Sequence, residues 1–277
     1  MDNQQILTIN ALSCKIFRAK QEFTLSPITF TLNNYETIGL VGESGSGKTT
    51  LGRLITGALC NIDNGNNGVI VDGKIKYMNK YNYQNPKVRK QLYFPIQMIY
   101  QDPKVALNEF MHVREQIKEA AILGYQKIKT DLSQEEWVAQ KVSHLLEILM
   151  LKDLENHYPF VMSGGQVRRL GIARVLAVQP NIIIADEPTA SLDASTKNMV
   201  LDYLVEYTNS RKKKNQPMGS IIISHDLDTI SRYSDKILVM KNGNLIELMT
   251  KDKNYNFNPK EDFTKKLWDD NAFFSRQ

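Results

Sequence analysis

Alternating hydrophobic and polar residues open the chain. Residues 6–17 (ILTINALSCKIF) and 23–32 (FTLSPITFTL) alternate with a period of about two, which predicts β-strands. A turn is expected at Asn33–Asn34, because asparagine tolerates turn conformations. Residues 36–42 (ETIGLVG) then form an apolar strand that runs into a glycine-rich loop. The pattern therefore predicts a β-rich beginning that leads directly to a loop.

Helical spacing follows this loop and returns in the middle of the chain. Residues 49–59 predict a helix, and residues 68–78 (GVIVDGKIKYM) predict a further strand or hairpin. Apolar residues recur at helical spacing over residues 108–123 and again over 134–151. The pair Ser133 and Glu136 forms a capping box, which marks the start of the second of these helices.

Strands and helices alternate in the later part of the chain. Residues 182–186, 220–224 and 236–240 are short apolar runs, separated by the helical segments 195–210 and 226–234. Strands that are apolar throughout fit a parallel sheet covered by helices on both faces. The fold class is therefore α/β, with a mostly parallel sheet.

The chain is expected to form a single domain over residues 1–277. Residues 1–104 and 161–250 would form the core together with an N-terminal antiparallel β subdomain. A helical subdomain would be inserted at residues 105–160, and residues 251–277 would form a short C-terminal tail.

Composition excludes several classes of protein. The 277 residues carry a net charge of +5, but acidic and basic residues are interspersed, so the excess does not indicate a nucleic-acid partner. Cys14 and Cys60 lack metal-ligand spacing and are expected to be reduced thiols. No run approaches the about 18 apolar residues needed to cross a bilayer. The polar start MDNQQILTIN does not resemble a secretion signal, so we expect a cytosolic chain.

The loop GESGSGKT follows a predicted strand and opens a predicted helix. It fits the phosphate-binding pattern G-x-x-x-x-G-K-[ST], whose glycines let backbone N–H groups surround phosphates. Lys48 would reach the β- and γ-phosphates, and the Thr49 hydroxyl would bind Mg²⁺. The expected ATP-binding residues of this P-loop are Gly42, Glu43, Ser44, Gly45, Ser46, Gly47, Lys48, Thr49 and Thr50.

Polar side chains stand where other predicted strands end. Asp186 would hold Mg²⁺, and Glu187 would polarise the attacking water. His225 follows a second apolar strand and would sense the γ-phosphate, because parallel strands present their carboxyl ends to ligands. Gln101, in YQDP, would lie near Mg²⁺ and the water. The expected catalytic residues are thus Glu187, His225, Gln101 and Lys48, and the expected metal ligands are Thr49, Gln101 and Asp186.

A second candidate anion loop is MSGGQ, at residues 162–166. It contains no general base, and its glycines precede a helix-like run, a combination typical of an anion site at a helix N-terminus. One nucleotide does not need two such loops.

A resemblance carried by six ordered motifs explains why the chain has two such loops. The P-loop, YQDP, MSGGQ, ADEP, SLDAS and SHD together resemble the ATPase subunit of an ATP-binding cassette (ABC) transporter, a P-loop NTPase, over nearly the whole chain. In that family the signature loop caps the γ-phosphate bound by a second subunit packed head to tail. The resemblance implies that Ser163, Gly164, Gly165 and Gln166 act in trans. It also implies that Ser191, Leu192 and Asp193 form the D-loop, which crosses the interface.

A narrower resemblance suggests the type of transporter. The stretch YQDPKVALNEFMHVREQI and the later EDFTKKLWDD are similar to ATPases of the oligopeptide, dipeptide and nickel uptake family. Ala106 and Glu109 replace the usual Ser and Pro there, and Met162 replaces the usual Leu of the signature. This resemblance implies an importer of peptides, nickel or metal–chelator complexes, at the cytoplasmic face of the cell membrane.

The same resemblance implies partners and further site residues. The partners would be a second ATPase chain (a paralogue or a second copy), two transmembrane permease subunits and, indirectly, an extracellular binding protein. The segment 105–113 would lie near the permease. Phe17 is the candidate for stacking on adenine. No iron–sulfur cluster is expected, because the cysteine-bearing extension of some relatives is absent from this sequence.

Three alternatives remain at this stage. An ABC protein acting on DNA or ribosomes would carry a long coiled-coil insertion or two cassettes, and the sequence has neither. A non-catalytic cassette is not favoured, because Lys48, Gln101, Glu187 and His225 are all present. An exporter ATPase is disfavoured only by analogy with the uptake-type motifs.

Overall fold

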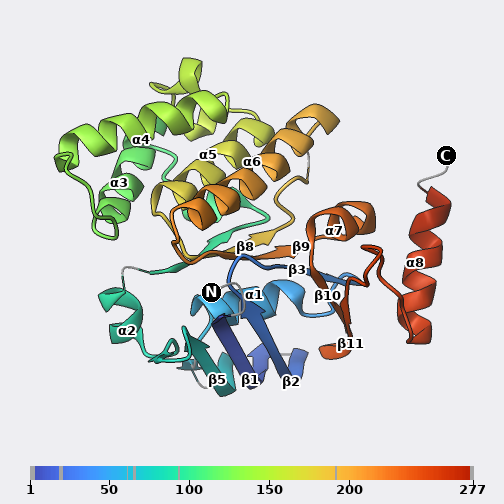
Figure 1. Ribbon diagram of the computed structural model, residues 1–277. Helices are drawn as coiled ribbons and strands as arrows, with labels where there is room; N and C mark the ends of the chain where they lie inside the picture. The colour runs from blue at the N-terminus through green and yellow to red at the C-terminus, as the bar shows by residue number, and fades with distance from the viewer. Residues whose placement is uncertain are drawn as a thin grey trace.

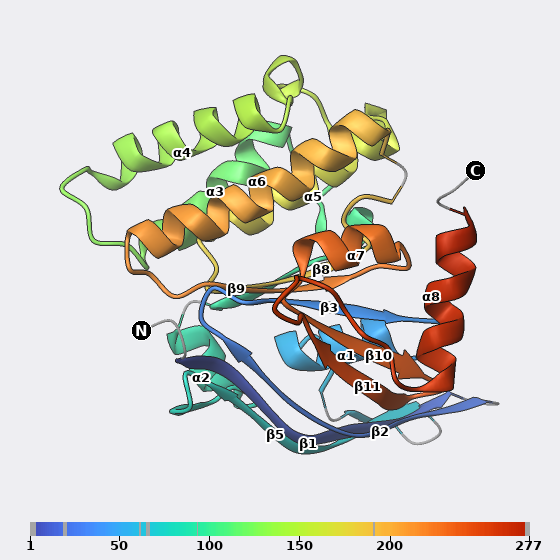
Figure 2. The same ribbon diagram turned by 45° about the vertical axis from the view of Figure 1, so that its right-hand side comes forward.

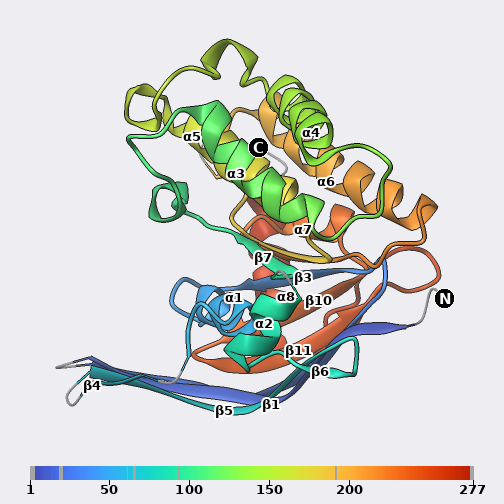
Figure 3. The ribbon, with the colours of Figure 1, turned by 90° about the vertical axis from the view of Figure 1, so that its left-hand side faces the viewer.

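Two β-sheets lie in separate layers with helix α1 (Lys48–Thr56) between them, as Figures 1 and 3 show. The computed structural model describes residues 4–18, 21–60, 62–64, 67–92, 94–190 and 192–274. Helices cover the outer face of one sheet, and the other sheet forms the opposite surface of the molecule (Figure 2). The predicted fold class, a mixed α/β core with an antiparallel N-terminal sheet, is confirmed.

The N-terminal sheet is antiparallel. Its strand order is β2-β1-β5-β4, and β6 pairs with β5. Leu7 and Ile9 of the first strand are buried and Asn10 is exposed, so the period-two pattern places apolar residues toward α1. The strands are β1 (Gln5–Arg18), β2 (Gln21–Asn33), β4 (Ile62–Asn64), β5 (Asn67–Tyr77) and β6 (Tyr81–Asn82).

The second sheet is the core of the molecule. Its order is β11-β10-β3-β9-β8-β7, with parallel pairing throughout except for the antiparallel edge strand β11. Every residue of β8 and β9 is buried, as expected for strands covered on both faces. The strands are β3 (Thr37–Gly42), β7 (Ile96–Ile99), β8 (Ile182–Asp186), β9 (Gly219–Ile223), β10 (Lys236–Lys241) and β11 (Asn244–Thr250).

Helices α5, α6 and α7 lie over the core sheet; α3 packs beside α5, and α4 lies on the outer side of this helical layer (Figures 1 and 2). Apolar residues from α3, α4, α5 and β8 share one buried cluster that includes Ile117, Leu145, Leu170 and Ile183. The helices are α2 (Pro86–Gln91), α3 (Val113–Tyr125), α4 (Gln134–Ile148), α5 (Gly164–Ala177), α6 (Ala194–Lys213), α7 (Leu227–Tyr233) and α8 (Asp262–Phe274). Short 3₁₀ turns are η1 (Pro103–Ala106), η2 (Lys152–Leu154) and η3 (Pro159–Val161).

Two differences from the sequence pattern have physical causes. The helix expected from Asn108 begins at Val113, because the Gln116 side chain accepts from the Asn108 N–H (3.1 Å) and donates to its carbonyl (2.9 Å). These bonds hold Asn108 in a turn. The tail after residue 250 contains α8, whose Phe263 and Trp268 pack against a cluster with Ile237 and Met249. No helix among the described residues is long and apolar enough to cross a membrane.

Basic residues gather where the segment after α3, helix α4 and the end of α6 meet. Burial, and then the positive charge of Arg211, lower the pKa of Lys127 to about 7. Burial, Lys214 and Arg211 lower the pKa of Lys141 to about 8. Each ammonium therefore destabilises the folded state when it is charged.

The variant Lys127→Met should be more stable than the wild type near pH 7. The folded-state pKa of Lys127 lies below the unfolded value of about 10.4, so wild-type stability should rise as the pH increases from about 7 toward 10. The advantage of Lys127→Met should shrink over the same range. Thermal melting between pH 7 and pH 9.5 measures the stability difference between Lys127→Met and the wild type. The variant Lys129→Met, at an exposed lysine, is the control. A stability difference that does not change with pH would contradict the prediction.

Candidate functional site

Three core strands end at the same edge of the sheet. In the parallel register, Ile223 of β9 is paired with Leu40 of β3 on one side and with Asp186 of β8 on the other. The P-loop follows β3, Glu187 follows β8 and His225 lies two residues beyond β9. Parallel pairing therefore brings together side chains that lie up to about 180 positions apart in sequence.

The P-loop passes from β3 into α1 through left-handed backbone. Gly45 has φ +78° and Gly47 has φ +101°, values that favour glycine. Within this loop the Lys48 Nζ donates to the carbonyls of Gly42 and Glu43, each at 2.8 Å. Burial lowers the pKa of Lys48, and the carboxylates of Glu187 and Asp186 oppose that shift. The lysine thus lies inside the loop, with acidic groups nearby.

Asp186 and Thr49 form a pair of oxygen ligands beside the P-loop. The Thr49 hydroxyl donates to Asp186 Oδ2 at 2.7 Å, although the two residues lie on different elements. Burial raises the pKa of Asp186, and the hydrogen bond from Thr49 opposes the increase. A carboxylate and a hydroxyl are hard oxygen donors of the kind that Mg²⁺ binds next to phosphates. The residues present therefore fit a magnesium site.

Glu187 is held firmly at the end of β8. Its backbone is left-handed (φ +47°), and its N–H donates to the carbonyl of Ile223 at 2.9 Å. The carboxylate Oε1 accepts from the His225 N–H at 3.0 Å and lies 2.8 Å from His225 Nδ1. The Glu187 side chain is 12% exposed, whereas that of His225 is 79% exposed. The carboxylate is thus oriented, and the imidazole faces the opening.

A cavity of about 450 Å³ unites these groups. Eleven of the predicted residues line it: Gly42, Ser44, Gly45, Gly47, Lys48, Thr49, Thr50, Gln101, Asp186, Glu187 and His225. Glu43 and Ser46 belong to the loop but do not line the cavity; Ser46 is buried beneath it. Two further lining residues, Phe23 and Ile223, were missed by sequence reasoning.

The structure does not bring Phe17 to this cavity. Phe17 is paired with Glu22, whereas the neighbouring pair is Ile16 with Phe23. Because adjacent residues of a strand point to opposite faces, Phe17 and Phe23 lie on different faces of the hairpin. The Phe23 ring packs against the P-loop, where a Cβ added at Gly47 would lie 2.9 Å from Phe23 Cζ. The period-two alternation of strand β2, in which Phe23 lies, would have been the signal for this residue.

The signature loop is a well-formed helix start at another place. Ser163 caps α5, its hydroxyl accepting from the Gln166 N–H (3.3 Å), while the Gln166 side chain accepts from the Ser163 N–H (2.9 Å). Ser163 and Gly164 are exposed, and no described atom lies within 4 Å of a Cβ added at Gly164. None of the four predicted signature residues lines the P-loop cavity. The chain therefore presents two anion-type loops that do not share a cavity.

Asp193 also lies outside this cavity. Its carboxylate caps α6, accepting from the Thr196 N–H at 3.0 Å and from the Thr196 hydroxyl at 2.7 Å. Leu192 packs beside the signature loop, 3.3 Å from a Cβ added at Gly165. Ser191 lies outside the described residues. The described part of the predicted D-loop is thus next to the signature helix of the same chain.

Comparison with known proteins supports the resemblance seen in the motifs. Residues 25–190 match the family described as ABC transporter. The oligopeptide transport ATP-binding protein OppF of Streptococcus mutans is 37% identical over 254 residues, which cover 90% of this chain and 75% of the relative. OppF of Haemophilus influenzae is 35% identical, with coverage of 96% of this chain and 78% of the relative.

Solved structures agree with the fold. A dimeric ATP-binding cassette in a post-hydrolysis state, bound to ADP and phosphate, matches with a TM-score of 0.69 at 21% identity, covering 88% of this chain and 98% of that one. CbiO1 of Clostridium perfringens, part of an ABC transporter complex, matches with a TM-score of 0.67 at 27% identity, covering 96% and 93%. The chain belongs to the ABC transporter family, as one of its ATP-binding, ATP-hydrolysing subunits.

Proposed function

We propose that this chain powers a peptide importer, binding ATP in the P-loop cavity and hydrolysing it in a head-to-tail dimer. The proposal of a dimer is supported by the separation of the two anion loops within one chain. The P-loop cavity holds Lys48 and Glu187, while exposed Ser163 and Gly164 start a helix elsewhere. A second ATPase subunit would place its signature loop over this cavity. The substrate class is supported by relatives named for oligopeptide transport.

Each part of the cavity has a role in ATP binding. The P-loop backbone and Lys48 would hold the phosphates, and Phe23 would contact the base in place of Phe17. Thr49, Asp186 and Gln101 would hold Mg²⁺, which supplies charge neutralisation at the phosphates when it is bound.

Glu187 would act on the attacking water. General-base assistance requires a carboxylate held within hydrogen-bond reach of the water, and the two contacts from His225 orient this one. The exposed His225 ring would reach the γ-phosphate from the mouth of the cavity. Hydrolysis then proceeds as phosphoryl transfer to water, by positioning and charge stabilisation.

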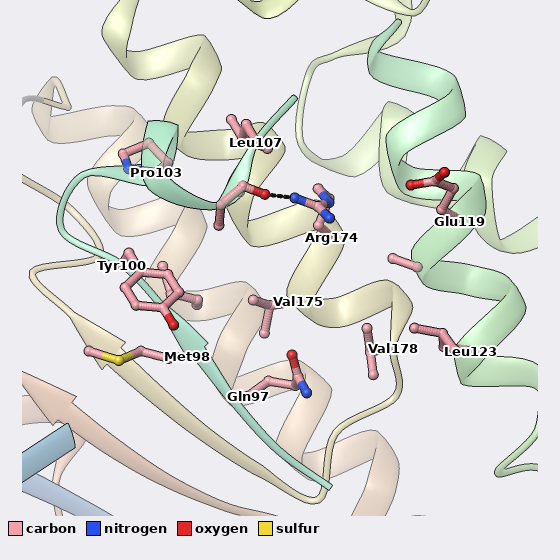
Figure 4. Close-up of a pocket in the computed structure, with 14 residues that line it drawn as sticks. Gln97, Met98, Tyr100, Pro103, Leu107, Glu119, Leu123, Arg174, Val175 and Val178 are labelled. Carbon is pink, nitrogen blue, oxygen red and sulfur yellow. Dashed lines mark hydrogen bonds between the residues drawn. The ribbon is translucent and has the colours of Figure 1, made fainter. Parts of the chain in front are cut away.

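A second cavity supports a permease contact. It has a volume of about 260 Å³ and lies between the segment after β7 and helices α3 and α5. Leu107, Leu123 and Val178 line it, and Arg174 donates to the carbonyl of Ala106 across it (Figure 4). Nearby Val105 and Phe110 are 66% and 83% exposed. A segment of a permease subunit would occupy this groove, and the chain would then lie at the cytoplasmic face of the membrane.

Capture of the complex tests this function. Glu187→Gln should slow hydrolysis and trap the closed state, so tagged chain purified from solubilised membranes with ATP should carry a second ATPase chain and two multi-span proteins. Peptides presented by the binding protein should stimulate ATPase activity of the reconstituted wild-type complex. Stimulation by nickel or a metal chelate, but not by peptides, would contradict the substrate class; recovery only with ribosomes or nucleic acid would contradict the transport role.

Phe23→Leu should weaken ATP binding by about fivefold, because it removes an aromatic contact worth about 1 kcal/mol while keeping an apolar side chain. Phe17→Leu should leave the affinity within twofold. Binding of a fluorescent ATP analogue to each full-length variant measures this, and melting temperatures check that both fold. The opposite ranking would restore Phe17 as the base contact.

Gly164→Asp should separate nucleotide binding from hydrolysis. The site is open in this chain, so melting temperature and ATP affinity should stay near the wild-type values. ATPase activity should fall by about 100-fold, because the carboxylate would face the γ-phosphate bound by the partner subunit. The neutral variant Gly164→Asn should lose less activity. Equal activity of Gly164→Asp and the wild type would contradict a role in trans.

A further inference from the structure

Arg168 joins the signature helix to two residues of the hydrolytic site. It lies in the second turn of α5 and is only 7% exposed. One guanidinium nitrogen, Nη2, donates to the carbonyl of Gln101 at 2.8 Å, and the other, Nη1, donates to the carbonyl of Glu187. A single side chain thus bonds the backbone of both the loop after β7 and the end of β8.

We propose that Arg168 is a positioning residue that holds Glu187 and Gln101 in place for hydrolysis and ties them to the helix carrying Ser163. The inference rests on the proposed role of Glu187. It gives the signature loop a mechanical connection within its own chain. A partner ATP that displaces Ser163 would move α5, and Arg168 would transmit that movement to the hydrolytic site on the same chain.

The backbone of Glu187 explains why it needs support. Left-handed backbone is unfavourable for a residue with a Cβ, and it persists only where the surroundings hold it. Here the N–H donates to Ile223, and the carbonyl accepts from Arg168 and from the Ala190 N–H (3.2 Å). The direction of the carboxylate follows from this backbone conformation. Loss of the Arg168 bond would let the carboxylate turn away from its position beside His225.

The chemistry of the guanidinium suits this task. Its planar donors can bond two carbonyls at once, whereas an ammonium is a point charge on a flexible stem. Hydrogen bonds from a charged donor are stronger than neutral ones. Burial lowers the pKa of Arg168, and the carboxylates of Glu187 and Asp102 oppose that shift. The buried guanidinium therefore has acidic groups near it as well as two carbonyl acceptors.

Arg89 offers a matched control. It is also buried, at 9% exposure, and its Nη1 also donates to two backbone carbonyls, those of Tyr83 (3.1 Å) and Gln84 (2.9 Å). It does not line the P-loop cavity. Replacing either arginine removes a comparable set of bonds, so only a role in positioning should distinguish the two variants in hydrolysis.

The test compares Arg168→Gln, Arg168→Lys and Arg89→Gln in the full-length chain within its transporter complex. Arg168→Gln should lower kcat for ATP at least tenfold and leave KM within about twofold, with Arg168→Lys between it and the wild type. Arg89→Gln should keep kcat within twofold, whatever its melting temperature. In a Glu187→Gln background, adding Arg168→Gln should reduce the remaining rate by less than twofold, because both changes act on one group.

The outcomes separate this inference from the proposed function. A wild-type kcat in Arg168→Gln, beside an inactive Glu187→Gln variant, would overturn the positioning role alone. An equal loss of kcat in Arg89→Gln would also overturn it. So would a double variant, Glu187→Gln with Arg168→Gln, whose fold-loss of kcat equals the product of the two single-variant losses. An active Glu187→Gln variant would overturn the proposed role of Glu187 and this inference together.

Discussion

Parallel hydrogen bonding among β3, β9 and β8 fixes the positions of the groups that line the P-loop cavity. Each strand ends at one edge of the sheet, and the ladder continues past the strands where the Glu187 N–H donates to Ile223 and the Ser224 N–H donates to Leu40. The P-loop, the Asp186–Glu187 pair and His225 therefore share one rigid frame. Because all residues of β8 and β9 are buried, this frame is shielded from solvent on both faces.

Helix α5 extends this frame outward. Its first residue is Gly164, next to the exposed capping Ser163, and two of its arginines, the buried Arg168 and the half-buried Arg174, bond the segment after β7. Arg168 donates to Gln101, and Arg174 donates to Ala106 in the groove proposed for the permease. In the proposed complex, α5 would connect the partner subunit, the residues Gln101 and Glu187, and the groove proposed for the permease.

The P-loop and the signature loop of one chain lie in different places, so they cannot both contact the same nucleotide. Each loop is a helix start with glycines, so each satisfies the local chemistry for a phosphate. The P-loop lies in a cavity with Lys48, Asp186 and Glu187, whereas the signature loop faces outward with open space at Gly164. In the proposed dimer, the signature loop of one subunit would face the P-loop cavity of the other.

The sequence by itself determined the fold class, the family and most residues of the cavity, because these depend on local signals. Glycine spacing, strands with apolar faces and carboxylates at strand ends are all visible along the chain. Other features depended on contacts between distant segments. Phe23 lines the cavity and Phe17 does not, because strand pairing, and not order in the sequence, decides which face a side chain occupies. Helix α3 begins later than the sequence pattern predicted, because Gln116 holds Asn108 in a turn. The role proposed for Arg168 depends on folding, which brings the carbonyls of Gln101 and Glu187 to one guanidinium. The partners of these residues are decided by tertiary packing.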